Sequence, residues 1–163
     1  MHSRIFQLEK SKEDIEDNMP EEYQFDYDCR HAWFVGQVAD YVDEDTDKNE
    51  DIEWLLECIK ECNRFFKINR TGTEVESITF LPGFKRMYFF ERFNKLQQTV
   101  DEMNLDDFTN SITAYRLRQL IEEKFGFYIC CEDKLQAMDD FVRDLSDTEE
   151  ITYYFGTTLD YHC

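Results

Sequence analysis

Apolar positions recur along the chain with two periods, and the order of these patterns predicts an α+β fold. Spacings of three and four residues, typical of one buried helix face, predict helices at 30–42, about 50–67, a stretch through Phe89–Met103, 111–125 and 133–146. Short runs rich in β-branched and aromatic residues predict strands at 4–8, 74–81, 127–131 and 151–161, the last bent near Gly156. We therefore expect a single α+β domain over residues 1–163, with a small mixed sheet of about four strands covered by about five helices.

One segment follows neither period. Residues 11–28 carry eight carboxylates, Pro20 and no basic residue after Lys12, so they predict an exposed acidic loop. Tyr23, Phe25 and Tyr27 lie at alternate positions, which indicates that the end of this loop is attached to the core.

Composition supports a folded chain rich in helices. Fifteen Phe and nine Tyr provide ample material for a core, which disfavours disorder in spite of the charge. Only five Gly and two Pro are present, which argues against a turn-rich all-β fold. The start of the chain has no signal-peptide pattern, and no apolar run approaches the length of a membrane span. We expect a cytoplasmic protein, no membrane partner and six reduced cysteines.

Cysteine and histidine pairs raise the hypothesis of a metal site. Two such pairs brought together could bind zinc through thiolate and imidazole donors. However, Cys58 and Cys62 are separated by three residues within a predicted helix, beside its apolar stripe, where free cysteine acts as a small hydrophobic residue. We favour core thiols and expect no cofactor. The remaining candidate ligands are Cys58, Cys62, His162 and Cys163.

A calcium loop is also disfavoured. Asp43, Asp45 and Asp47 alternate as at the start of such a loop, but Lys48 occupies the position that needs glycine. Trp54 stands where a bidentate Glu is required. The aspartates instead predict an acidic lead-in to the next helix.

No catalytic motif is apparent in the sequence. The chain lacks a Gly-rich phosphate loop, and two of its three histidines lie at the extreme ends. Cys29 and His31 are too close in sequence to suggest a catalytic pair. We expect a protein that is not an enzyme, although a small enzyme using the Cys/His pairs stays open as an alternative.

The net charge of −19 is unevenly distributed. Residues 1–63 hold 19 acids and 6 bases, residues 64–124 hold 9 and 10, and residues 125–163 hold 9 and 2. Two acidic ends therefore enclose a neutral middle. This balance disfavours direct nucleic-acid binding, because phosphate neutralisation needs Lys and Arg. It favours a basic protein partner, whose association an opposite potential accelerates.

The candidate surface for such a partner combines the aspartates with a row of glutamates. Helical spacing predicts that Glu50, Glu53, Glu57 and Glu61 form one anionic row. A basic, nucleic-acid-handling protein could bind it, in the sharpest version because the row mimics DNA. A charge that serves only solubility is the alternative. The candidate partner-binding residues are Asp43, Asp45, Asp47, Glu50, Glu53, Glu57 and Glu61.

Four runs in the first sixty residues resemble acidic proteins of bacterial mobile elements that have not been characterised. The runs are Arg4–Gln7, His31–Gly36, Val38–Val42 and Asn49–Leu55. Such elements also carry acidic antirestriction and anti-CRISPR proteins, some of them DNA mimics. The resemblance implies a DNA mimic by class, and it assigns no functional residue.

Overall fold

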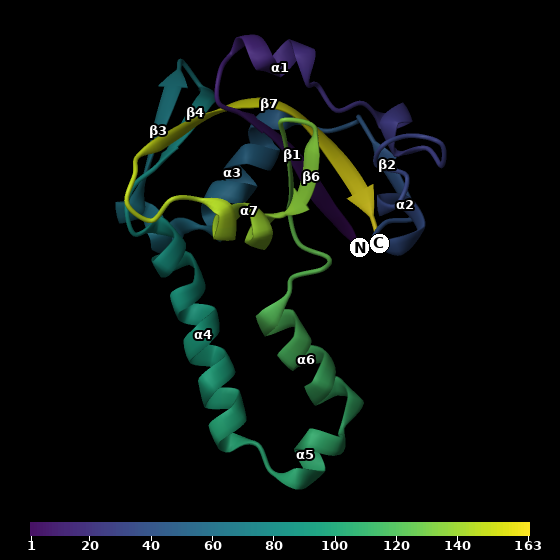
Figure 1. Cartoon of the computed structure of the whole chain (residues 1–163), viewed down its shortest axis with the longest axis vertical. Coiled ribbons are helices and arrows are strands. Elements are labelled where there is room, and N and C mark those ends of the chain that lie inside the picture. Colours follow the sequence, from purple (N-terminus) through teal and green to yellow (C-terminus); the bar gives the residue numbers. More distant parts are fainter.

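A mixed seven-stranded sheet forms the centre of the protein in a computed structural model that describes all residues from Met1 to Cys163 (Figure 1). The strand order is β3-β4-β7-β1-β5-β6, and β2 also pairs with β7. Only the β1–β5 pair is parallel. The strands are β1 (His2–Glu9), β2 (Tyr41–Asp43), β3 (Phe66–Thr71), β4 (Glu74–Phe80), β5 (Tyr128–Cys131), β6 (Lys134–Ala137) and β7 (Ile151–His162).

Strand β7 organises the sheet. It pairs with β1 along one edge and with β4 and then β2 along the other. The β1–β7 register shifts between Phe6 and Leu8, opposite Gly156. Here the buried Gln7 side chain accepts a hydrogen bond from the backbone N–H of Thr157 at 3.1 Å. A Cβ at Gly156 would lie 1.9 Å from Gln7 Oε1, so any other residue there would force the buried Gln7 side chain to move.

The helices are short apart from α4. One core lies against α3 and α7, and includes Phe6, Ile78 and Phe155. The other lies under the segment that carries η1 and α2, and includes Ile5 and Leu159. The helices are α1 (Glu13–Asp17), α2 (Phe34–Gln37), α3 (Lys48–Cys58), α4 (Phe84–Glu102), α5 (Leu105–Thr109), α6 (Ser111–Ile121) and α7 (Met138–Asp144), with 3-10 helices η1 (Glu22–Phe25) and η2 (Lys60–Phe65).

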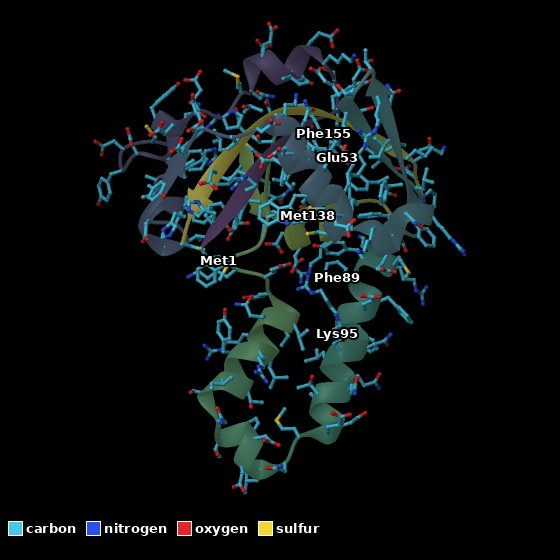
Figure 2. All side chains as sticks on the ribbon, turned by 180° about the vertical axis from the view of Figure 1, so that it is seen from behind. Met1, Glu53, Phe89, Lys95, Met138 and Phe155 are labelled. Carbon is cyan, nitrogen blue, oxygen red and sulfur yellow. The ribbon has the colours of Figure 1, made fainter.

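Helices α4, α5 and α6 project away from the sheet as a helical hairpin (Figure 1). We call residues 84–125 the arm and the remaining residues the body. Phe84, at the root of α4, is the one buried residue of the arm, and neither α5 nor α6 buries any side chain. Figure 2 shows Phe89 at the root of the arm and Lys95 farther along it. No helix in the structure is both long and apolar enough to cross a membrane.

The expected α+β class with one mixed sheet is confirmed, but the expected counts of about four strands and about five helices are both too low. Two of the missing strands lie in segments predicted as helices. In 30–42, Gly36 adopts a φ of 94° and interrupts α2, and the backbone N–H of Asp40 bonds to the carbonyl of His162, so that β2 follows. In 133–146, Glu132 and Asp133 adopt positive φ and form a tight turn, so β6 precedes α7.

Other boundaries also differ from the predictions. The helix expected over 50–67 ends at Cys58, and Phe66 begins β3. The helix expected over 111–125 ends at Ile121. The strands predicted at 4–8, 74–81, 127–131 and 151–161 are all present.

Candidate functional site

The predicted row of glutamates is interrupted. Helix α3 ends at Cys58, so Glu61 lies in η2 and not on the same helix. Glu53 pairs with Arg70 at 2.6 Å, and Glu57 pairs with Lys60 at 2.5 Å. All of these pairs are exposed and contribute little to stability, but they cancel charge on the row. Glu50 and Glu61 alone keep an exposed carboxylate without a basic partner.

Two of the predicted aspartates have structural roles. Asp47 is the N-cap of α3, where its side chain accepts from the backbone N–H groups of Asn49 and Glu50. Asp43 lies in β2 and accepts from the backbone N–H of Asp45 at 2.7 Å. Asp45 is exposed, and its carboxylate has no partner.

A larger acidic surface is formed where the segment 13–28 meets the segment 40–47. The backbone N–H of Glu22 donates to Glu44 Oε1 at 3.0 Å, which joins the two segments. Together they contain thirteen carboxylates and no Lys or Arg, and none of these carboxylates pairs with a Lys or Arg elsewhere. Asp40 alone contacts a histidine, His162, at 3.1 Å. We call these two segments the acidic face.

The acidic face is held in place by contacts to the body. Phe25 is buried and packs its ring against Phe34. Gln7 Nε2 donates to the carbonyl of Ile15 at 2.8 Å, which fixes α1. The predicted acidic loop 11–28 thus contains two short helices, and its attachment through Phe25 is confirmed, whereas Tyr23 and Tyr27 are exposed.

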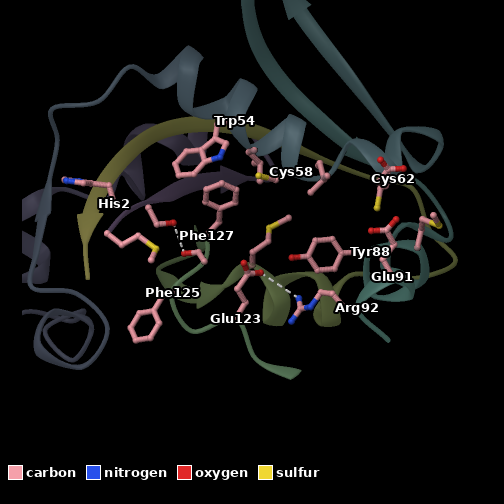
Figure 3. Close-up of a pocket in the computed structure, with 18 residues that line it drawn as sticks. His2, Trp54, Cys58, Cys62, Tyr88, Glu91, Arg92, Glu123, Phe125 and Phe127 are labelled. Carbon is pink, nitrogen blue, oxygen red and sulfur yellow. Dashed lines mark hydrogen bonds and ion pairs between the residues drawn. The ribbon is translucent and has the colours of Figure 1, made fainter. Parts of the chain in front are cut away.

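A pocket lies where the arm joins the body (Figure 3). Its volume is about 350 Å³, and its walls are mainly apolar. One side is polar, because Asp139 on α7 accepts two hydrogen bonds from Arg92, at 2.5 and 2.7 Å, and one from the Tyr88 hydroxyl at 3.0 Å. Burial raises the pKa of Tyr88 well above its ordinary value.

This polar cluster attaches the arm to the body. The Asp139 side chain is only 2% exposed. Its burial is compensated by the ion pair with the Arg92 guanidinium. Burial, with Asp139 adding to it, raises the pKa of the neighbouring Glu123 carboxyl, 3.9 Å from Arg92. Because Asp139 occupies the Arg92 guanidinium, the pocket offers no free cation to an anionic ligand.

Four of the six cysteines have raised pKa values, which disfavours the thiolate that an activated nucleophile needs. Burial raises the pKa of the Cys58 thiol beside the pocket, and raises the pKa of Cys62 to about 11. Both thiols are therefore protonated at neutral pH, whereas a nucleophile or a metal ligand must be a thiolate. Cys130 and Cys131 are buried in the sheet with pKa values raised to about 11 and about 12 by burial.

The candidate metal ligands are not brought together. Cys58 is the last residue of α3 and Cys62 lies in η2, whereas His162 bonds to Asp40 and to the N-terminal amine, and Cys163 contacts Met1. No group of three or more Cys, His, Asp or Glu side chains is arranged to hold a metal ion. His31 is buried against Phe25, and burial lowers its pKa.

Comparison of the chain with protein families, with curated proteins and with solved structures finds no match in any of the three. The geometry of the chain itself therefore carries the functional argument. Sequence reasoning placed the acidic surface on Asp43, Asp45 and Asp47 and on the glutamates of 50–61, whereas the acidic face comprises 13–28 and 40–47 and shares only the three aspartates with that prediction. The eight carboxylates without a nearby base in 11–28 were the available signal for it.

Proposed function

We propose that the protein is a non-enzymatic binding protein whose acidic face engages a basic, nucleic-acid-handling protein. The observation that carries this proposal is the set of thirteen carboxylates in the acidic face, none of which has a Lys or Arg partner. Elsewhere in the body, carboxylates such as Glu76, Asp133 and Glu150 are paired with bases. A surface that keeps its negative charge unpaired is suited to a positively charged partner.

The position of the acidic face supports this role. Phe25 and the Gln7–Ile15 hydrogen bond fix its backbone, so the carboxylates lose little further freedom when a partner binds. The interruption of the α3 row removes Glu53 and Glu57 from the argument for DNA mimicry. Mimicry of duplex DNA therefore rests on the acidic face, and it makes a distinct prediction: duplex DNA competes for the same partner.

The experiment compares three forms of the protein as immobilised bait. The acidic-face variant carries Asp17→Lys, Asp26→Lys and Asp45→Lys, at exposed carboxylates that accept no side-chain hydrogen bond. The control variant carries Glu74→Lys, Asp147→Lys and Glu149→Lys, exposed body positions outside the acidic face, and it has the same net charge as the acidic-face variant.

We expect the wild type and the control variant to retain the same basic protein from a bacterial lysate, and the acidic-face variant to lose it. Retention should fall steeply as salt rises, because exposed charges are screened beyond about 8 Å at physiological ionic strength. Displacement by duplex DNA would support mimicry. Equal retention by the two charge-matched variants, or binding indifferent to salt, would refute the proposal.

A further inference from the structure

Most basic residues of the arm lack a carboxylate partner, unlike those of the body. Nine of the eleven Lys and Arg residues of the body have a carboxylate within 4.0 Å; Lys48 and Arg64 are the exceptions. Of the seven in the arm, Arg92 alone has one. The protein has 37 acids and 18 bases, so bases without a carboxylate partner are unexpected in it. Their concentration in the arm indicates a surface that binds carboxylates of another molecule.

The arm also exposes large apolar side chains. Phe90, Phe93 and Val100 lie on one side of α4, at positions i, i+3 and i+10, and are 53%, 61% and 54% exposed. Leu105 and Phe108 at the end of the arm are 76% and 66% exposed. Two helices alone bury too little surface to be stable, and a hairpin that leaves such residues in water gains stability by association.

Charge is polarised along the arm. Residues 99–110, which we call the tip, contain four acids and no base. Residues 84–98 and 111–121, which we call the shaft, contain six bases and one acid. The tip and the shaft are therefore complementary to each other, and the folded hairpin places them at different distances from the body (Figure 1).

We propose that two copies of the chain associate by pairing their arms in antiparallel orientation, the tip of each against the shaft of the other. Such a contact has two-fold symmetry, so every tip–shaft attraction occurs twice. The apolar residues of α4 and of the tip are covered in the same contact. The partner's arm thus supplies the carboxylates that the shaft lacks within its own chain.

Antiparallel pairing also separates the acidic bodies. Helix α4 has 19 residues and is about 28 Å long. Bodies at opposite ends of such an overlap lie well beyond the screening distance of about 8 Å at physiological salt. Parallel pairing would instead place the two acidic tips together and the two acidic bodies together. Repulsion between like charges disfavours both contacts.

The exposed area is of the size that a reversible dimer uses. The apolar residues placed in the contact are each at least 53% exposed, and burial of their exposed portions would cover roughly 550 Å² of apolar surface on each chain; they are Phe90, Phe93, Val100, Leu105 and Phe108. A contact of this size with a polar rim corresponds to a dissociation constant on the order of micromolar. We expect a monomer–dimer equilibrium that depends on concentration.

A charge exchange tests both the contact and its direction. The tip variant carries Asp101→Lys, Glu102→Lys and Asp106→Lys, and the shaft variant carries Arg86→Glu, Lys95→Glu and Arg116→Glu. Each variant alone places like charges together, so sedimentation velocity should show dimers weakened roughly tenfold to a hundredfold. The two variants mixed should form a heterodimer of near wild-type affinity, because each reversed tip then faces a reversed shaft.

The control variant with Glu74→Lys, Asp147→Lys and Glu149→Lys has the same net charge as the tip variant and should keep its dimer. The double variant with Phe93→Ser and Val100→Ser should abolish the dimer. The single variant Tyr27→Ser, at a body position 92% exposed, should leave the dimer unchanged. A wild type that stays monomeric at every concentration would overturn the proposal, as would a mixture of tip and shaft variants that fails to recover. Circular dichroism of each variant verifies that it is folded.

Discussion

The body and the arm use the same amino acids in opposite ways. The body encloses two cores against the faces of its sheet, and Phe84 is the only one of the 40 buried residues that belongs to the arm. The body pairs almost all of its bases, whereas the arm pairs Arg92 only. The body thus buries its own apolar side chains and pairs its own charges, except in the acidic face. The arm is a helical hairpin that leaves apolar side chains exposed and most of its bases unpaired, as expected of a surface that binds a second molecule.

The largest expected effect compares one aromatic from each region. Phe6 is fully buried in the body, so Phe6→Ala removes a ring from a packed core and should lower the free energy of unfolding by about 3–5 kcal/mol. Phe93 on the arm is 61% exposed, so Phe93→Ala in dilute protein should change it by less than about 0.5 kcal/mol. Urea denaturation followed by circular dichroism measures both. Similar losses at the two positions would mean that the arm has a core of its own.

A smaller effect is expected at the attachment of the arm. Asp139→Asn leaves the half-buried Arg92 without its counter-charge and should cost about 3 kcal/mol. Asp144→Asn breaks the exposed pair with Lys134 and should cost less than about 1 kcal/mol. Hydrogen exchange at the root of α4 should increase in the first variant only. An unchanged root would show that Arg92 and Asp139 do not hold the arm.

The smallest effect is a pH dependence at Glu123. Its carboxyl has a raised pKa because of burial, so the folded state disfavours the ionised form, and the penalty is present at neutral pH and relieved as pH falls through the raised pKa. Glu123→Gln should therefore raise the melting temperature slightly at neutral pH and have no effect in acidic buffer. Glu122→Gln, at the next residue, which does not line the pocket, is the matched control. Equal shifts at the two positions would contradict a burial effect.

Local pattern was sufficient for the elements whose side chains follow one period throughout. Strands β1, β4 and β5 and the long helix α4 fall where the sequence predicts them. The segment 133–146 differs from its prediction for two reasons. The turn at Glu132 and Asp133 uses positive φ without glycine, and the spacing of Leu135 and Met138 fits a single helix as well as a strand followed by a helix. The β2 strand depends on pairing with β7, more than a hundred residues away, which no local pattern reveals.

The candidate site was predictable in charge but only partly in place. Counting charges showed a neutral middle between acidic ends, and most of that middle is the arm. Ion pairs such as Glu53–Arg70 form between separate elements, so the sequence could not show that the α3 row is partly neutralised. The exposure of Phe93 and Val100 could not be predicted from the sequence either. A helical apolar stripe predicts a buried face but does not say what buries it.

The most direct test of the division into a complete body and an incomplete arm is hydrogen exchange of the whole wild-type chain at low and high protein concentration. We expect strands β1 and β7 to exchange slowly and equally at both concentrations. Amides of α4, α5 and α6 should exchange quickly in dilute protein and become protected as concentration rises. Protection of the arm that is independent of concentration, or concentration-dependent protection confined to the body, would contradict this division.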